Sequence, residues 1–559
     1  MTSQHLLTIR ERLTRTFIDQ YRLNYCPQSC QHWVETFIGG QGWPDVDLKK
    51  GRESGEVIRT YLERVLAIAY RVNHAREPYV KSVLSCALYH WYQVNPNNWN
   101  WWWNQIGKQR LLGNIALLLD DDLDANWLKR IALDMPKKAT MTGANLADLC
   151  HGVAIGALLE GNQARLAKAM RQLATTLQTT SDEGIQRDYS YQQHGAQIYN
   201  GGYGESFFNV ALVWAYACEG SSFQFIDADK QQLLNYFEQG TLWMTYSRQF
   251  DFNVCGRSVA KPYLEKRDYH RNLAFQAQRL QSLAPHTRNQ LESIRRFYEG
   301  FEAYPYQGFK VFWRSDYCSQ VSAHYSVTVK ANSCRTEPIE QGNQENLKGG
   351  WLGFGSMNIT VTGKEYHDIF PCWDWRFIPG VTTPAVERAP KVWGSVEQVT
   401  HWAGGVSDGR SGVMTFELEK DGCHGLKSWF FFDGLVVALG AGISANSELP
   451  LATTLNQCWL EGEVEVGGQL PNSAEWVYHN QCGYISLDHR PINVERSLRS
   501  EKWHSINRHL ENRDNLKEVL RLTIDHGLCL IMMDTPMPSY RQPLLTEQSV
   551  MRATQMSRS

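Results

Sequence analysis

The chain has 559 residues, 43% of them hydrophobic, so it is long enough to build more than one hydrophobic core. Its formal charge of −2 argues against partners that require a strongly basic chain, such as nucleic acid or an anionic membrane surface. The 13 cysteines form no CxxC pair, so neither a zinc site nor a disulfide framework is expected. The 20 tryptophans suit either a dense core or stacking on sugar rings.

The first residues, MTSQHLLTIRERLTRTF, are amphipathic and charged. They lack the apolar core of a secretory signal, and no apolar run elsewhere is long enough to span a bilayer. Taken by itself, this start predicts a cytoplasmic chain with no membrane partner.

Residues 1–305 are predicted to be helical. The segment VIRTYLERVLAIAYRV, residues 57–72, has apolar residues at helical spacing, and Ser54 is placed to cap it. Many amphipathic hairpins in series favour a helical toroid or array. The other predicted helices are 77–92, 106–119, 145–159, 162–178, 207–219, 229–245 and 287–301.

Residues 306–540 are predicted to form antiparallel β-structure, because alternating, β-branched and aromatic segments are separated by Gly- or Asn-rich turns. Ser497–Asn507 is predicted to be a helix or a loop, and the polar residues 541–559 to form a loose tail. Helices followed by strands predict an α+β protein of two domains, with room for a ligand in a cleft between them. The predicted strand segments are 311–317, 324–332, 355–363, 412–420, 427–443 and 462–468.

The stretch DEGIQRDYSYQQHGAQIYNGGYGE, from Asp182 to Glu205, has too many aromatics, glycines and amides for a helix interior and no strand alternation. It is predicted to be an ordered loop between helices. It contains His194 and Tyr203, and a loop this rich in polar and aromatic groups is more often a site than a connector. The alternative is a rigid loop that only covers the helices.

Further candidates flank this loop in the sequence, and each has a structural alternative. NWNWWW contains Asn100, Trp101 and Trp102, which are either a stacking platform for sugars or an anchor between helices. TGANLAD contains Asn145, which could hold a substrate carboxylate or simply cap a helix. CGRSVAK contains Arg257, which could be an ordinary surface residue.

Two more candidate groups complete the set. Lys261 is the last residue of the CGRSVAK segment, and it could be an ordinary exposed lysine. RTEPIEQGNQENLKGGW contains Glu340 and Asn343 and is too polar for a central strand. It is predicted to be a hairpin loop or a loop that faces the helices across the cleft.

Taken together, these motifs resemble, in order and spacing, the polysaccharide lyase family of hyaluronate, chondroitin AC and xanthan lyases (family 8). The resemblance covers roughly residues 50–540 and rests on NWW followed by IG, TGAN, QHG followed by GYG, GRSVAK, IEQGNQEN and WDWRFIPGVTTP. It implies an incomplete (α/α) toroid followed by a β super-sandwich, no metal or other cofactor, and a monomer. Lys261 stands where the family usually has a second Arg, and Trp103 replaces a residue that is usually polar.

The resemblance implies β-elimination at a uronic acid in an acidic polysaccharide. Asn145 would neutralise the carboxylate, and Tyr203 would take the C5 proton and then protonate the leaving oxygen. Arg257 is expected to lower the pKa of Tyr203. The other roles are assistance or base catalysis by His194, orientation of Arg257 or the sugar by Glu340 and Asn343, and sugar binding by Asn100, Trp101, Trp102 and Lys261.

Two rival functions remain open at this level. A glycoside hydrolase would use two carboxylates facing the bond, and Asp182, Glu183, Asp188 and Glu205 are available in the loop. An inactive sugar-binding protein would keep only the fold. Hyaluronan, chondroitin and xanthan-type side chains all suit the proposed chemistry, and the sequence does not decide between endo and exo action. The family's usual export, to the periplasm or the medium, conflicts with the N-terminal sequence.

Overall fold

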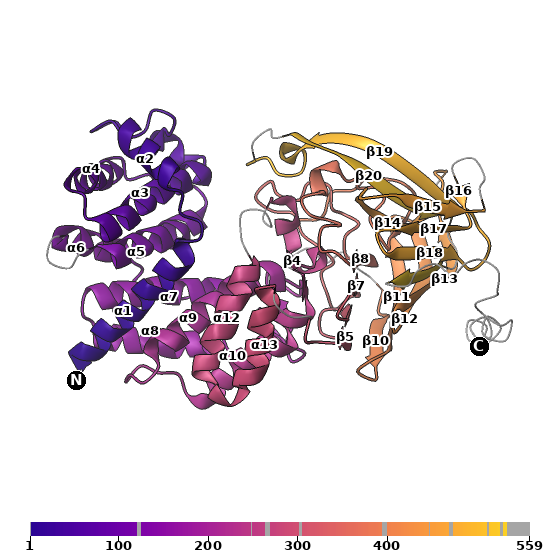
Figure 1. Ribbon diagram of the computed structural model, residues 1–559, viewed down its shortest axis with the longest axis horizontal. Helices are drawn as coiled ribbons and strands as arrows, with labels where there is room; N and C mark the ends of the chain where they lie inside the picture. Colours follow the sequence, from indigo (N-terminus) through magenta and orange to yellow (C-terminus); the bar gives the residue numbers. More distant parts are fainter. Residues whose placement is uncertain are drawn as a thin grey trace.

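The computed structural model has helices followed by antiparallel sheets, which confirms the predicted fold class (Figure 1). The helices lie on one side of the molecule and the sheets on the other, so the chain crosses once from one half to the other. No described helix is long and apolar enough to cross a membrane. The structure describes residues 2–533 except 120–123, 248, 263–268, 301–303, 394–399, 447, 469–472, 511–513 and 526–528; the predicted tail, 541–559, lies outside them.

The helical half has two layers. Helices of the inner row contact one another in chain order, and each packs on a helix of the outer row, as expected for an (α/α) toroid. The inner row is α3 (Gly55–Ala75), α5 (Lys108–Leu118), α7 (Gly143–Leu159), α9 (Glu205–Cys218) and α12 (Tyr269–Leu283). The outer row is α4 (Pro78–Val94), α6 (Ala125–Asp134), α8 (Gln163–Thr175), α10 (Asp227–Gln239) and α13 (Arg288–Tyr298).

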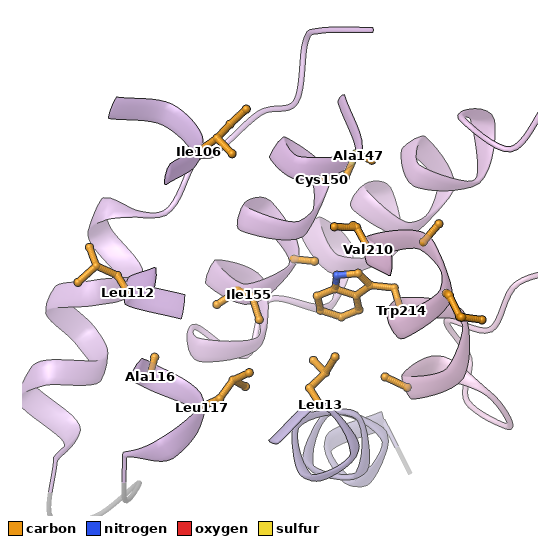
Figure 2. Close-up of a cluster of buried hydrophobic side chains, with 14 of the residues drawn as sticks. Leu13, Ile106, Leu112, Ala116, Leu117, Ala147, Cys150, Ile155, Val210 and Trp214 are labelled. Carbon is orange, nitrogen blue, oxygen red and sulfur yellow. The ribbon is translucent and has the colours of Figure 1, made fainter. Parts of the chain in front are cut away.

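Two further helices, α1 (Thr2–Tyr21) and α2 (Pro27–Thr36), extend this half, and α1 packs against both α5 and α9. Apolar side chains from α1, α5, α7 and α9 meet around Trp214 of α9, which is fully buried (Figure 2). Leu13 comes from α1, Ile155 from α7 and Leu112 from α5, so residues far apart in the sequence share one core. This packing, more than helix propensity, stabilises the individual helices.

The helix predictions hold in position but not in every detail. Ser54 occupies the N-cap of α3, yet its side chain makes no capping hydrogen bond. The predicted helix 229–245 ends at Gln239, because Gly240 follows and the chain then turns into the strands β3 (Thr245–Tyr246) and β4 (Gln249–Phe250).

The β half is built from three antiparallel sheets, and each predicted strand segment overlaps an observed strand. The four-stranded sheet contains β5 (Gly308–Phe312), β6 (Tyr317–Val321), β7 (Ser326–Lys330) and β8 (Ser356–Thr360). The five-stranded sheet has the order β16 (Ser473–Ala474), β19 (Ile492–Lys502), β20 (Asp514–Ile524), β14 (Ala452–Trp459) and β9 (Thr382–Thr383). The eight-stranded sheet has the order β10 (Ala403–Ser407), β11 (Gly412–Lys420), β12 (Cys423–Phe432), β13 (Leu435–Ala445), β21 (Cys529–Met533), β18 (Cys482–Ser486), β17 (Trp476–His479) and β15 (Val464–Gly467).

The two larger sheets face each other and share a core. Phe416 and Trp429 of the eight-stranded sheet belong to the same buried cluster as Leu455 and Leu522 of the five-stranded sheet. The alternation of buried and less buried residues along β11 follows from this one-sided packing. The domain boundary near residue 305 remains a prediction, although α13 ends at Tyr298 and β5 begins at Gly308.

The prediction of a helix or loop at Ser497–Asn507 is wrong for most of its length. Residues up to Lys502 belong to β19, which pairs with β20 over ten residues, from Asn493 opposite Thr523 to Lys502 opposite Asp514. Polar residues occupy both faces of this ribbon, so it lacks the apolar–polar alternation by which strands are recognised.

We expect Trp214→Ala to destabilise the helical half strongly, because it leaves a large cavity in the shared core of α1, α5, α7 and α9. Such a truncation typically costs about 3–5 kcal/mol of unfolding free energy. Denaturant unfolding followed by the helical circular dichroism signal measures this loss. Trp99→Ala is the matched control, because the Trp99 side chain is 73% exposed. Equal effects of the two substitutions would contradict the assigned core.

Candidate active site

The loop from Asp182 to Glu205 packs against the end of the β half and has more regular structure than predicted. Short strands β1 (Gly184–Ile185) and β2 (Tyr191–Gln192) pair with each other, and a π-helical turn, Asn200–Gly204, leads into α9. His194 has a φ of 60°, an uncommon value for a residue other than glycine. The loop is thus a rigid support that fixes the directions of its side chains.

Arg257 lies at the centre of the candidate site. Its Nη2 donates a hydrogen bond to the Tyr203 hydroxyl at 2.9 Å, and its Nη1 donates to Glu340. His194 Nδ1 lies 2.9 Å from Glu340 Oε2 and 3.0 Å from Arg257 Nη1. The structure therefore brings together four of the predicted site residues from three distant parts of the chain.

The protonation of His194 follows from its partners. A carboxylate only accepts hydrogen bonds, so we assign the ring proton to Nδ1, which donates to Glu340; the approach of Arg257 Nη1, which also only donates, is then a close contact and not a hydrogen bond. This assignment leaves the lone pair of Nε2 available to a substrate.

A second set of groups holds Arg257 in place. Its Nε donates to Glu345 Oε2 at 2.9 Å, and Lys261 Nζ lies 2.9 Å from Glu345 Oε1. The Tyr199 hydroxyl donates to Glu340 Oε1 and accepts from the backbone N–H of Arg257, both at 3.0 Å. Two cations and two carboxylates therefore balance one another in a buried network. Lys261 is part of this network through Glu345.

The pKa values reflect burial and these charges. Burial raises the pKa of Tyr203, and Arg257 lowers it as predicted, but the effect of burial is larger, so the balance is upward. Burial also favours the neutral form of Glu345, but Lys261 and Arg257 outweigh it and lower the pKa of this carboxyl. Without a substrate, Tyr203 is therefore a neutral phenol held against a cation.

Glu183 connects this cluster to the beginning of α7. It accepts from the His194 backbone N–H at 2.8 Å and from the Thr142 hydroxyl at 2.6 Å. Thr142, not Asn145, is the N-cap of α7, so the capping role considered for Asn145 is wrong. The Asn145 side chain lies in the first turn, and its buried Oδ1 has no hydrogen-bond partner within the described residues. A carboxylate would take its hydrogen bond from Nδ2, the donor of the same amide.

The aromatic segment lies beside α7 and does not join the charged cluster. Asn100 accepts from the Trp102 backbone N–H through its Oδ1 at 3.0 Å, which gives it a structural role in this turn. Trp101 is 40% exposed, whereas Trp102 packs edge-on against Trp103. The turn η2 (Trp103–Gly107), which follows Trp101 and Trp102 in the chain, contacts α7, the helix that carries Asn145.

Within the described residues, no contact joins Asn343 to Arg257, and its predicted role in sugar binding stays a prediction. Asn343 is exposed, and its backbone oxygen lies 2.6 Å from His509 Nε2. Asn346 acts on the site instead, because its Nδ2 donates to the backbone oxygen of Glu340 at 2.9 Å. The polarity of this loop indicated a site, but it did not show which amide would face inward.

The sequence did not single out Trp393, which covers one side of the cluster. Its ring stacks on His194 with 5.2 Å between centroids, and the Arg257 guanidinium lies 5.6 Å from it. The surrounding sequence, KVWGS, has no pattern that marks a site. Tyr199 and Glu345 were also missed as site residues, although both lie in motifs that the sequence highlighted.

Three of the four carboxylates considered for a hydrolase, Glu183, Asp188 and Glu205, are engaged in structural contacts. Asp188 is buried and accepts from the Ser190 hydroxyl at 2.7 Å and from the Arg314 backbone N–H at 2.6 Å. Glu183 holds the loop, as described above, and Glu205 is buried at the start of α9. Asp182 is exposed. Within the described residues, no group of three or more His, Cys, Asp or Glu is arranged to hold a metal ion.

Known proteins share this architecture and much of the sequence. The chondroitinase-AC of Pedobacter heparinus is 31% identical over 79% of this chain and 66% of its own length. The polysaccharide lyase 8 family protein HylA of Enterococcus faecalis is 26% identical over 74% of this chain and 35% of its own length. The chain thus spans less than two thirds of either relative. A solved chondroitinase AC lyase has a TM-score of 0.86 and 27% identity, covering 96% of this chain and 84% of that one.

Two family models match consecutive parts of the chain. Residues 43–296 match the N-terminal alpha-helical domain of polysaccharide lyase family 8, and residues 307–530 match its super-sandwich domain. These parts coincide with the helical and the sheet-rich halves of the structure. The chain belongs to polysaccharide lyase family 8.

Proposed function

We propose that this protein is a lyase that cleaves a uronic-acid-containing polysaccharide by β-elimination and leaves an unsaturated uronide end. The observation that carries the proposal is the contact of one guanidinium, that of Arg257, with both Tyr203 and His194. The names of similar proteins, which include a chondroitinase-AC, a hyaluronate lyase and a xanthan lyase, support the same class of substrate.

Tyr203 and Asn145 carry the proposed reaction. The amide of Asn145 hydrogen-bonds to the uronic carboxylate, so that negative charge can build on it as the C5–H bond breaks. The proton passes to the Tyr203 oxygen, and the electron pair forms the C4–C5 double bond while the C4–O bond breaks. Tyr203 then returns its proton to the leaving oxygen, so no net proton is gained or lost.

Arg257 makes the base form of Tyr203 attainable. Burial raises the pKa of Tyr203, and the guanidinium at 2.9 Å favours the phenolate. Glu340 and Glu345 keep Arg257 in this position and compensate its buried charge. His194 serves as the base itself if Nε2 keeps its lone pair, or assists Asn145 at the carboxylate if Nε2 carries a proton that it can donate.

The binding groups suit an acidic polymer. Trp101 and Trp102 offer an aromatic face for a pyranose ring, just before the turn η2 that contacts α7. Lys261, with a third of its side chain exposed, adds positive charge. Hyaluronan and chondroitin are the first substrates to test, followed by xanthan and alginate. The hydrolase alternative is not favoured, because the structure uses Asp188 and Glu183 to hold the loop.

We expect the purified chain to produce ultraviolet absorbance from a new C4–C5 double bond with at least one of these polymers, without added metal. Tyr203→Phe should lower kcat by a factor of about 100 to 10,000, because it removes the group that transfers the proton. Tyr189→Phe is the matched control, since this tyrosine lies in the same loop and its hydroxyl faces Gln232 and Asn235. New reducing ends without absorbance would indicate hydrolysis and contradict the proposal.

Arg257→Lys should lower kcat and move the limb of the pH–rate profile that reports Tyr203 deprotonation to higher pH. Arg257 lowers the pKa of Tyr203 by its charge and its hydrogen bond, and a lysine cannot keep the contacts with Tyr203, Glu340 and Glu345 at the same time. The phenolate is then less favoured, so more alkaline solution is needed to form it. Initial rates measured from neutral pH to well above pH ~10, the ordinary pKa of tyrosine, locate this limb in wild type and in the variant. An unchanged limb would remove Arg257 from the proposed role.

A further inference from the structure

A long ribbon of the β half reaches the candidate active site. Strands β19 and β20 run along the upper side of this half (Figure 1), and the chain turns after β19 into a segment, Trp503–Leu510, that we call the ribbon tip. The tip docks on the loop that contains Glu340 and Glu345. The mechanism proposed above does not use any residue of this tip.

Backbone contacts join the ribbon tip to the segment around Glu345. Asn507 forms an antiparallel bridge with Glu345. On either side of this bridge, the Leu347 N–H donates to the Ile506 oxygen at 3.2 Å, and the Arg508 N–H donates to the Gln344 oxygen at 3.1 Å. The tip therefore holds the backbone that carries the Glu345 carboxylate.

The Asn507 side chain adds a contact to the other partner of this carboxylate. It is 1% exposed, and its Nδ2 donates to the backbone oxygen of Ala260 at 3.0 Å. Its Oδ1 accepts from the His509 N–H at 3.0 Å. Ala260 lies in the short turn η6 (Gly256–Ala260), which begins next to Arg257 and is followed by Lys261.

These contacts form a closed ring of interactions. Arg257 and Lys261 both bind Glu345, Glu345 is bridged to Asn507, and Asn507 binds the turn from which Arg257 and Lys261 project. Both polar atoms of the Asn507 side chain are used within the protein, so it acts through other residues. An amide suits this place, because one atom must donate to a carbonyl and the other must accept from an N–H.

We propose that Asn507 is a positioning residue of the lyase: it fixes the turn that carries Arg257 relative to Glu345 and so sets the guanidinium against Tyr203 and His194. This inference rests on the proposed function. Replacing Asn507 leaves the Ala260 carbonyl buried without its donor, and the turn can then shift. A displacement of about 1 Å at a reacting group can lower a rate by up to about 100-fold.

The test compares wild type with Asn507→Ala and Asn507→Asp on whichever polymer wild type cleaves fastest. Asn507→Asp keeps the acceptor for His509 but places an oxygen opposite the Ala260 carbonyl. Asn456→Ala is the matched control, because Asn456 is also buried and bonded through both amide atoms, to Tyr366 and Tyr484, within the β half. kcat, KM and the melting temperature are measured for each variant.

We expect both Asn507 variants to lose roughly 10- to 100-fold in kcat with little change in KM. The limb of the pH–rate profile that reports Tyr203 deprotonation should also move to higher pH, because a displaced Arg257 stabilises the phenolate less. The Asn456→Ala control should have a lower melting temperature than wild type, but its pH–rate profile should keep the wild-type limb. The charged and titratable groups that face Tyr203 are Arg257, His194, Tyr199, Glu340 and Glu345.

The inference would be overturned if both Asn507 variants kept the wild-type kcat and the wild-type limb of the pH–rate profile. It would also be overturned if the Asn456→Ala control showed the same shift of that limb. If wild type itself yields no unsaturated product from any polymer, the proposed function fails, and a crystal structure of Asn507→Ala then decides the positioning role. Arg257 displaced from Tyr203 and Glu345 in that structure supports it. Arg257 in its present contacts overturns it.

Discussion

The organisation of this protein depends on burying one guanidinium, that of Arg257. A buried charge is costly unless charges and hydrogen bonds compensate it, and Glu340 and Glu345 provide that compensation. Both glutamates belong to a loop of the β half, whereas Arg257 lies between α10 and α12 of the helical half. The cluster therefore exists only when the two halves of the chain are folded against each other. Removing one partner leaves an unpaired buried charge, so the cluster also contributes to holding the halves together.

The same constraint explains the unusual backbone around the site. Gly256, with a φ of +52°, lies so close to Tyr199 that a Cβ would be only 2.1 Å from the ring. Tyr199 can therefore donate to Glu340 and accept from the Arg257 backbone only if residue 256 is a glycine. His194 likewise has a positive φ and is held by Glu183. Backbone conformations of this kind often occur where side chains must be held in a precise arrangement.

Tyr203 illustrates how burial and charge oppose each other at the site. Burial makes the phenol a weaker acid, and Arg257 makes it a stronger one. A phenol whose phenolate is stabilised by one well-placed cation is sensitive to the position of that cation. This sensitivity connects the reaction to contacts some distance away, including those of the ribbon tip, and it distinguishes residues that position Arg257 from residues that only stabilise the fold.

The sequence alone determined the order of the two halves, because helical periodicity and strand alternation are local properties. The helix predicted from this periodicity is α3, and one strand predicted from alternation is β11. It also identified Asn145, His194, Tyr203, Arg257 and Glu340 as candidates, since they lie in motifs of polar and aromatic residues with similar order to those of a known family. The tertiary structure decided what those motifs could not. Asn343 faces outward while Glu345 and Tyr199 face Arg257, because inward or outward orientation depends on loop geometry. Trp393 and Asn507 reach the site from positions 199 and 313 residues beyond His194, and no local pattern reports contacts between segments so far apart.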